Sequence, residues 1–232
     1  MSDFQGIPHE GLHFLQSLAQ NNNRDWFEAH KADYTRHVLE PSQALVAALG
    51  ARLQEISPNI CYDLRTNGSG SLMRIHRDTR FSPDKTPYKT HMTMMFWEGD
   101  GKKTEHPGFG LRFDASGGGL MVGMFHFSKP MLATYREAVL DDKLGKALVA
   151  AVEKVKAAGD YTVGGEHYKR VPRGLDADHA RADWLRYAGL HAYSDALSAE
   201  VLSSPQLVET CYQHFARMTP IQQWLVKIAS KG

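Results

Sequence analysis

The sequence predicts an α+β fold, in which an antiparallel β-meander over about residues 71–127, joined by 161–171, packs against N-terminal and C-terminal helices. Three observations predict it. Apolar side chains recur at helical spacing from residue 10 to residue 56, a stretch rich in β-forming residues and glycine turns follows, and helical spacing then returns. Short turns between the strands indicate antiparallel pairing, because parallel strands need long crossovers.

The first two expected helices are separated by the run Asn21–Asn23. The first helix carries an apolar stripe of Leu12, Leu15 and Leu18. Asn23 is a suitable N-cap for the second helix, because its side-chain oxygen can accept a hydrogen bond from the first turn. This helix carries Trp26, Phe27 and Tyr34, and aromatic side chains at helical spacing usually mean burial.

A third helix is expected to begin at Pro41 and to end before Ser57-Pro58. Proline fits the first turn of a helix better than its interior, so we expect a break before Pro41. The apolar face of this helix comprises Leu45, Val46, Leu49, Leu53 and Ile56.

Three strands are expected in the central region, at Tyr88–Trp97, Gly108–Phe113 and Leu120–Phe127. A turn at residues 98–101 follows the first strand. Gly117–Gly119 is expected to form the hairpin loop between the other two, since glycine tolerates positive φ.

The later part of the chain is expected to be mostly helical. Ser128 with Pro130 starts one helix, and a second carries Leu144, Leu148, Val152 and Val155. Residues 161–171 are expected to form a hairpin about Gly164-Gly165, and Asp178 to open a short helix. The pairs Ser204-Pro205 and Thr219-Pro220 each indicate the start of a terminal helix. The last helix is expected to bury Ile221, Trp224, Leu225 and Ile228.

Composition limits the domain organisation and the compartment. The 232 residues show no repeat and no linker, so we expect a single domain over 1–232. Cys61 and Cys211 are far apart and fit no disulfide framework or zinc site, which favours free thiols in a reducing compartment. We find no secretory signal and nothing near the ~20 apolar residues of a membrane span, so we expect a cytoplasmic protein without a membrane partner. The oligomeric state is not predicted.

The charge balance bears on the partner. Lys and Arg total 27 against 26 Asp and Glu, whereas proteins that coat nucleic acid are usually strongly basic. Four histidines fall in the predicted sheet region, but none has the spacing of a metal motif. These residues are His76, His91, His106 and His126. We therefore expect no metal and no cofactor.

The segment Arg74–His91, called the basic loop below, carries the strongest functional signal. It holds five Lys and Arg residues, Arg74, Arg77, Arg80, Lys85 and Lys89, against two acids, Asp78 and Asp84. Ser82-Pro83 and Thr86-Pro87 favour turns and extended backbone over a helix. A loop of this kind can direct several cations at one anion, since arginine matches phosphate or carboxylate and lysine adds a point charge.

Three stretches of the sequence resemble a known family. The basic loop contains the run RDTRFSPDKTPYKTH, which is similar to the central signature of the DUF 2461 family of conserved hypothetical bacterial and fungal proteins. FLQSLAQNNNRDWFEAHKADY resembles its opening helices, and KRVPRG at Lys169–Gly174, followed by Asp176 and His179, resembles its later basic motif. The resemblance covers most of the chain and implies no particular activity.

Three functions stay open. The first is binding of, or catalysis on, a phosphorylated or other anionic small molecule by the following ligand residues: Arg74, Arg77, Arg80, Lys85, Tyr88, Lys89, Lys169, Arg170 and Arg173. The second is association with nucleic acid, with Trp97, Phe96 or Tyr88 stacking on bases. The third is a structural or interaction module, in which Arg77–Asp78 and Arg80–Asp84 pairs only brace the loop.

Two further expectations concern the geometry of the basic segments. Phe81 and Tyr88 are expected to anchor the basic loop by burying their rings. Tyr88 lies beside Lys85 and Lys89, which could lower its pKa for acid–base work; alternatively, its ring only holds the loop. The basic loop and the second motif, Lys169–Arg173, are expected to converge on one ligand.

Overall fold

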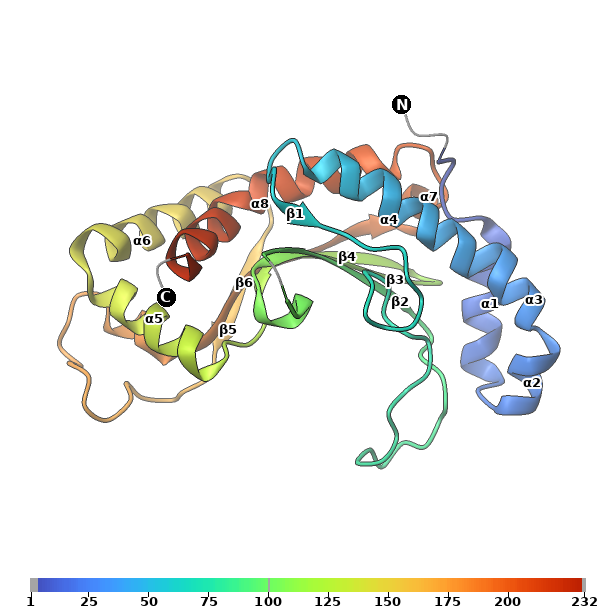
Figure 1. The fold of residues 1–232 in the computed structure, drawn as a ribbon, viewed down its shortest axis with the longest axis horizontal. Coiled ribbons are helices and arrows are strands. Elements are labelled where there is room, and N and C mark those ends of the chain that lie inside the picture. Colours follow the sequence, from blue (N-terminus) through green and yellow to red (C-terminus); the bar gives the residue numbers. More distant parts are fainter. Residues whose placement is uncertain (1–3, 100, 231–232) are drawn as a thin grey trace. The chain divides into compact units, whose positions relative to one another are not determined.

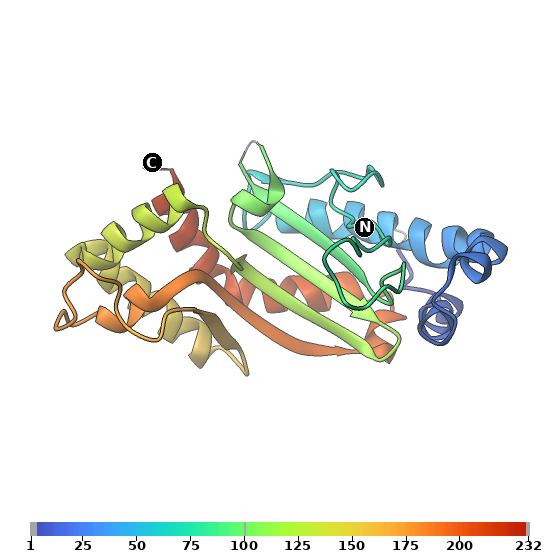
Figure 2. The same cartoon turned by 90° about the horizontal axis from the view of Figure 1, so that it is seen from below.

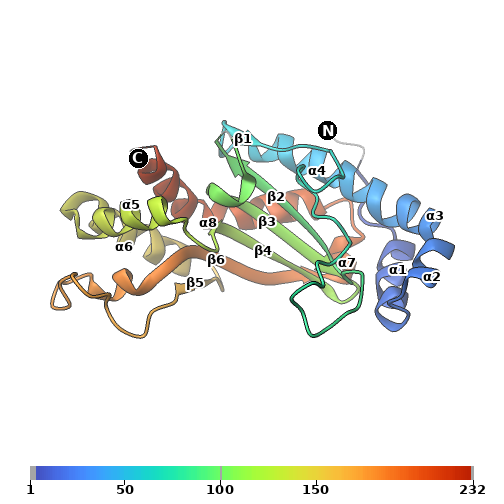
Figure 3. The same ribbon diagram turned by 60° about the horizontal axis from the view of Figure 1, so that its bottom comes forward.

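The computed structural model describes residues 4–99 and 101–230. Its strands are β1 (Ile60–Cys61), β2 (Met92–Glu98), β3 (Gly108–Asp114), β4 (Gly117–Met124), β5 (Thr162–Glu166) and β6 (Tyr187–Ser198). They form one six-stranded antiparallel sheet in the order β1-β2-β3-β4-β6-β5, and Figure 3 shows β2, β3 and β4 side by side. With helices before and after these strands, the fold is α+β, as predicted.

The chain divides into two compact units. Unit 1 comprises Met1–Phe96, Gly110–Leu120 and Asp195–Gln213, and unit 2 comprises Trp97–Phe109, Met121–Ser194 and His214–Gly232. Strands β2, β3, β4 and β6 each begin in one unit and end in the other. The expectation of a single domain stays a prediction. Within the described residues, no helix combines the length and apolarity needed to cross a bilayer.

The N-terminal helices of unit 1 follow the predicted order (Figure 1). They are α1 (His9–Gln20), α2 (Arg24–Ala29), α3 (Lys31–Asp33), a π-helix (Tyr34–Leu39) and α4 (Glu40–Leu53). The Asn23 side chain accepts a hydrogen bond from the Trp26 backbone N–H at 2.9 Å, which confirms the predicted cap. Phe27 and Tyr34 are buried as expected, whereas Trp26 is only half-buried.

The expected break before Pro41 is wrong. The backbone stays helical from Lys31 to Leu53, with the π-helix immediately before α4. The wider π turn bonds the Glu40 N–H to the Thr35 carbonyl, and Pro41 follows in the first turn of α4, where a missing N–H costs little. Leu45, Val46, Leu49 and Leu53 are buried on α4 as predicted, and the helix contacts β1 within unit 1. Ile56, the fifth residue of the predicted face, is only half-buried, because α4 ends at Leu53.

The loop between β3 and β4 differs from the prediction. The turn lies at Ala115-Ser116, and Gly117–Gly119 belong to β4. Asp114 closes the turn, because its carboxylate accepts hydrogen bonds from the Ser116 N–H at 2.9 Å and the Ser116 hydroxyl at 2.6 Å. Glycine is required at residue 117 for a steric reason, because a Cβ there would lie 2.5 Å from the Leu197 carbonyl oxygen.

Unit 2 contains α5 (Lys129–Leu140) and α6 (Asp142–Ala157), which are shown in yellow-green and yellow beside the red C-terminal part of the chain in Figure 2. Ser128 caps α5 as predicted, and Asp141 caps α6. The predicted apolar face of α6, Leu144, Leu148, Val152 and Val155, is buried. Helix α6 contacts β5 within the unit.

The predicted hairpin at residues 161–171 is wrong. Gly164 and Gly165 lie inside β5, at a bulge where its pairing with β6 shifts register. A Cβ at Gly165 would overlap the Gly189 carbonyl, so glycine permits the close approach of the two strands. Strand β6, which was not predicted, follows a short 3₁₀ helix at Ala182–Arg186.

The predicted start of a helix at Thr219-Pro220 is also wrong. The chain ends in α7 (Ala199–Leu202) and α8 (Leu207–Ala229), and Pro220 lies inside α8. The Thr219 hydroxyl instead donates back to the Phe215 carbonyl at 2.7 Å. Buried apolar side chains on both sides of Pro220 offset the roughly 3 kcal/mol that an interior proline costs. They include Phe215, Met218 and the four predicted residues, Ile221, Trp224, Leu225 and Ile228.

Candidate functional site

The basic loop projects from unit 1 as an irregular hairpin that ends in β2 (Figure 1). Isolated antiparallel bridges pair Leu72 with Met94 and His76 with Tyr88. Next to the His76–Tyr88 bridge, the Arg77 N–H donates to the Pro87 carbonyl at 2.8 Å. Beyond this point the chain has no regular strand pairing, so side chains must hold the tip.

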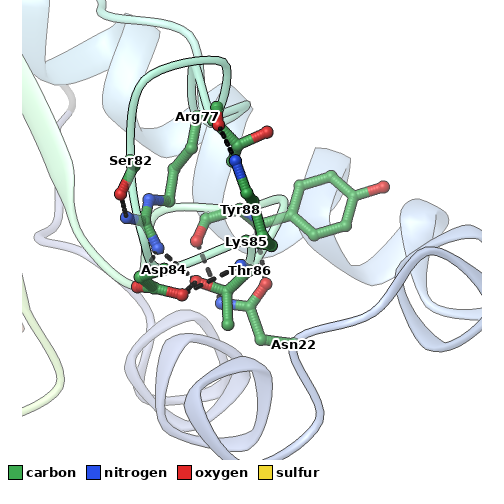
Figure 4. A network of polar contacts seen from close by, with 8 residues as sticks. Asn22, Arg77, Ser82, Asp84, Lys85, Thr86 and Tyr88 are labelled. Carbon is green, nitrogen blue, oxygen red and sulfur yellow. Dashed lines mark hydrogen bonds and ion pairs between the residues drawn. The ribbon is translucent and has the colours of Figure 1, made fainter.

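Arg77 is the centre of this loop (Figure 4). Its guanidinium donates to the carboxylate of Asp84, to the hydroxyl of Thr86 and, at 3.5 Å, to the hydroxyl of Ser82. The Arg77 side chain is only 25% exposed, because the loop wraps around it. The Thr86 N–H, the Arg77 guanidinium and the Thr86 hydroxyl together lower the pKa of Asp84 to about 2.

The other two cations near the tip also have partners within the loop. Arg80 binds Asp78 through two hydrogen bonds of 3.0 and 2.7 Å, which lower the pKa of Asp78 to about 2. The Lys85 ammonium donates to the Thr79 carbonyl at 2.8 Å. The expected pairs Arg77–Asp78 and Arg80–Asp84 are therefore exchanged, since Asp78 lies two residues from Arg80 and also accepts its backbone N–H.

The two aromatic rings of the basic loop behave differently. Tyr88 is 3% exposed and stacks on Phe27 with ring centroids 4.0 Å apart, which confirms its predicted anchoring role. Asn22 completes the anchor: its amide donates to the Tyr88 carbonyl at 2.9 Å and accepts from the Tyr88 N–H at 3.0 Å. Phe81 is 92% exposed, so its predicted burial is wrong. It lies at the tip beside the Arg80 guanidinium, 5.7 Å away, instead of reaching the core.

The environment of Tyr88 favours the anchoring role of its ring over the acid–base role. Burial raises the pKa of its phenol, and the charge of Glu28 raises it further. In Figure 4 the ring points away from Arg77, Asp84 and Thr86. The hydroxyl is therefore not activated by the lysines next to it in sequence.

A second group of basic side chains lies where the basic loop meets the sheet. It consists of Arg74, Lys89, His91 and Arg112, and we call it the cation face. The Lys89 ammonium donates to the Arg74 carbonyl at 2.8 Å, and Nη2 of Arg112 lies 3.4 Å from Nδ1 of His91. Within residues 4–99 and 101–230, no ion pair joins any of the four to an acid. Asp114 acts on His91 and Arg112 only at longer range.

The cations of this face repel one another. Burial lowers the pKa of Lys89, and the charge of Arg74 lowers it further. Burial likewise lowers the pKa of His91, with Arg112 and Lys89 adding to the effect. Because a guanidinium can only donate hydrogen bonds, its contact with Nδ1 corresponds to a neutral His91 that carries its proton on Nε2. Positive charge is thus concentrated here, and the nearby acids Asp78 and Asp114 act on it without forming an ion pair with these four residues.

Sequence reasoning missed Arg112 and gave His91 no role in anion binding. Arg112 was available as a signal, because it is an exposed charge between two buried residues of β3, Leu111 and Phe113. Such a position directs a side chain away from the core. His91 immediately precedes β2, but no spacing in the sequence relates it to a residue of β3.

The second basic motif lies in unit 2. Lys169, Arg170 and Arg173 are exposed, and none has an ion-pair partner in the part of the chain that the structure describes. Nearby in sequence, the Tyr168 ring lies 5.4 Å from the guanidinium of Arg136. Because the basic loop belongs to unit 1, convergence of the two motifs stays a prediction.

No group of three or more His, Cys, Asp or Glu residues is placed to hold a metal ion among the described residues. Cys61 is half-buried and Cys211 is buried, and neither forms a disulfide, as expected. Burial raises the pKa of Cys211, which makes it unreactive.

The sequence was compared with known proteins. The family described as conserved hypothetical protein (DUF2461) matches residues 10–224, a range that contains the N-terminal helices and both basic motifs. The chain belongs to the DUF2461 family. The resemblance seen in the three sequence stretches is thereby confirmed, and the basic loop and cation face of this DUF2461 protein both lie within the matched range. No curated protein matches the sequence.

Proposed function

We propose that this DUF2461 protein binds a small phosphorylated or carboxylated molecule at the cation face, Arg74, Lys89, His91 and Arg112. The observation that carries the proposal is the grouping itself: the Lys89 ammonium contacts the Arg74 carbonyl, Arg112 contacts His91, and none of the four is ion-paired to an acid within the described residues. Burial, followed by the neighbouring positive charges, lowers the pKa values of Lys89 and His91. Bringing like charges together costs free energy, and a bound anion would recover it. The guanidinium of Arg74 has no hydrogen bond to the described residues and is exposed, so it is available to a ligand.

The other predicted ligand residues of the basic loop have a supporting role in this proposal. Arg77, Arg80 and Lys85 use their hydrogen bonds on Asp84, Asp78 and the Thr79 carbonyl. They stiffen the loop that carries Arg74 and Lys89 at its two ends. A rigid support lowers the ordering cost of binding, because the cations are already in place before the ligand arrives.

The bound molecule is either a ligand or a substrate. For catalysis, the neutral His91 is the group at the cation face able to accept a proton, through Nδ1 once Arg112 turns to the anion. Binding itself would raise the pKa of His91, because an anion favours the imidazolium. Protons are then taken up on binding, and affinity strengthens as the pH falls through the pKa of His91.

The two alternative functions receive less support. Phe96 and Tyr88, two of the three aromatic residues expected to stack on bases, are buried, and Trp97 is half-buried. Phe81 is the exposed aromatic residue on the loop, so a nucleic-acid partner would have to stack there. A purely structural module agrees with the internal pairing of Arg77, Arg80 and Lys85. A structural module does not explain why Arg74 and Lys89, whose positive charges repel, lie close together.

The test is calorimetric titration with inorganic phosphate and a panel of phosphorylated and carboxylated metabolites. We expect Arg112→Gln and Arg74→Gln each to weaken binding about tenfold to a hundredfold, the loss of one charge-assisted hydrogen bond. Arg80→Gln is the matched control: it removes an exposed arginine of the same loop that is already paired with Asp78, so it should weaken binding far less than the loss of Arg74 or Arg112. Titrations in buffers of different ionisation enthalpy should detect proton uptake.

Three outcomes would contradict the proposal. One is the absence of binding of any anion by the unmodified protein at millimolar concentration. Another is an equal loss of affinity in Arg80→Gln and Arg112→Gln, which would move the site to the tip of the loop. Binding of a single-stranded oligonucleotide that depends on Phe81 and exceeds that of every small anion would favour the nucleic-acid function.

A further inference from the structure

A cavity of about 650 Å³ lies among the N-terminal helices of unit 1, apart from the basic residues discussed above. Its lining residues come from α1, α2, α3, the π-helix and the residues that follow α1 and α2, and include four histidines, His9, His13, His30 and His37. Phe14 and Trp26 supply its aromatic wall. The volume falls within the roughly 300–1,000 Å³ of small-molecule sites in proteins.

The frame of this cavity is fixed by local structure. At one side, Gly11 of α1 touches the backbone of His37, and any Cβ at Gly11 would overlap the His37 carbonyl. His37 itself lies in the π-helix Tyr34–Leu39. A π-helical turn is less stable than an α-helical one, and such turns occur frequently at functional sites because they redirect side chains. The turn here gives His37 its place at the cavity.

The aromatic wall forms a platform that is left partly uncovered. The Trp26 and His30 rings stack at a centroid distance of 4.2 Å and an interplanar angle of 19°, and Phe14 lies 5.4 Å from Trp26. Phe14 is buried, but Trp26 and His30 are only half-buried, so part of the stacked pair faces the cavity. Aromatic platforms of this kind bind flat ligands, since stacking on one base-sized ring is worth about tenfold to a hundredfold in affinity.

His30 also offers a directed hydrogen-bonding group. Its Nδ1 lies 2.7 Å from the Trp26 carbonyl, and because a carbonyl only accepts, Nδ1 carries the proton and donates. In the neutral ring Nε2 is then left as an acceptor. A ligand that lies beside His30 on the same face of Trp26, in the plane of the imidazole, could donate an in-plane N–H to that nitrogen while stacking on the uncovered part of the indole.

The charges of the lining select against anions. Glu10 and Asp33 line the cavity, and none of its lining residues, all within the described chain, is Lys or Arg. The histidines do not form a metal site, because no group of three potential ligands is suitably placed among residues 4–99 and 101–230. The cavity thus differs in its chemistry from the cation face.

From these observations we propose that the cavity binds a planar nitrogen heterocycle, uncharged or cationic, which stacks on Trp26 and donates a ring N–H to Nε2 of His30. This is a second site, independent of anion binding at the cation face. It would suit a nucleobase-like or benzimidazole-like ring, with the carboxylates of Glu10 and Asp33 favouring any positive charge on it.

The experiment is an NMR titration with benzimidazole, followed at the indole N–H signal of Trp26, which a Trp26→Phe spectrum assigns. Benzimidazole should shift this signal at millimolar concentration or below, whereas 1-methylbenzimidazole, which lacks the N–H, should bind about tenfold more weakly. Benzoate, a planar anion of similar size, should not bind. The cation-face variant Arg112→Gln should bind benzimidazole normally.

Two variants separate stacking from hydrogen bonding. His30→Phe retains an aromatic ring at the stack and should remove the difference between benzimidazole and its methylated analogue. Trp26→Leu lacks the indole signal, so binding to this variant is followed by saturation-transfer NMR on the probe; it should weaken both probes about tenfold to a hundredfold. His167→Phe, at an exposed histidine of unit 2, is the matched control and should change neither. A thermal melt confirms that each variant is folded.

The proposal is overturned if the Trp26 signal is unmoved by saturating benzimidazole, or if benzoate binds as tightly as benzimidazole. It is also overturned if both probes bind equally to the unmodified protein, because His30 would then accept no hydrogen bond. A failed anion titration at the cation face would leave this result untouched, so the two proposals fail separately.

Discussion

At the scale of single residues, one arginine determines the shape of the basic loop. Arg77 binds an acid and two hydroxyls across the loop, Asp84, Thr86 and Ser82, which no backbone pairing holds together. Arginine suits this role because its planar guanidinium carries five donors in a fixed fork. Arg77 thus makes three of the side-chain contacts that close the loop, and the Lys85 ammonium adds one to the Thr79 carbonyl.

The first prediction concerns the carboxyl of Asp84 in Arg77→Met. The pKa of Asp84 is about 2 in the intact loop, so the pair contributes stability above the ordinary carboxyl pKa near 3.8 and loses it as the pH falls toward about 2. Without Arg77, the pKa of Asp84 should rise toward its ordinary value, and the Thr86 hydrogen bonds should keep it somewhat below. NMR titration of the side-chain carboxyl carbon measures this. Arg80→Met is the control, because it should move Asp78 and leave Asp84 unchanged; the opposite pattern would contradict the pairing.

At the scale of elements, the sequence predicts what short-range chemistry decides. The Asn23 and Ser128 caps and the buried face of α6 were predicted because each depends on residues within a few positions of one another. Strand β6 was missed because its partners, β4 and β5, lie far away in sequence. Pro220 was read as a helix start because the sequence alone does not show how much apolar surface α8 buries on both sides of it.

The same distinction applies to the candidate site. The basic loop was recognised from its composition, and Arg74 and Lys89 were included in the predicted set. Which of its cations are already paired depends on how the loop folds, and Arg77, Arg80 and Lys85 proved to have partners. Arg112 extends from β3 to contact His91, and these two residues are neighbours only because of the register of the sheet. Residue types were therefore predictable, and their grouping was not.

The second prediction tests the connection between the loop and the N-terminal helices. Asn22, in the turn after α1, makes two hydrogen bonds to the backbone of Tyr88. Asn22→Ala would leave both backbone groups of Tyr88 without these partners in a partly buried place. It should lower the free energy of unfolding by about 1–3 kcal/mol.

Asn21→Ala is the matched control, since the neighbouring asparagine makes an exposed hydrogen bond to the Ser17 carbonyl of its own helix. Its effect should stay below about 1 kcal/mol. Chemical denaturation of the two variants gives the comparison. Equal losses of stability would show that Asn22 does not tie the loop to the helices.

At the scale of the whole molecule, the near balance of 27 basic and 26 acidic residues makes local arrangement decisive. A net charge of +1 gives little long-range attraction for polyanions. Affinity for an anion must come from a place where cations gather without acids, as at the cation face. The acid-lined cavity among the N-terminal helices shows that unit 1 also contains a region of opposite character.

The last prediction is that the two units unfold together. Strands β2, β3, β4 and β6 and helix α8 each have residues in both units, so neither unit contains a complete set of its own elements. Unfolding one unit would interrupt five elements partway along their length. Buried backbone groups at the interruption would lose their hydrogen-bond partners, which costs free energy. We therefore expect one cooperative transition in denaturant. Indole NMR signals report on each unit separately, Trp26 on unit 1 and Trp224 on unit 2, and their midpoints should coincide. Distinct midpoints, or a variant such as Asn22→Ala that shifts the Trp26 midpoint alone, would show instead that the units are independent and that the single domain expected from the sequence is two.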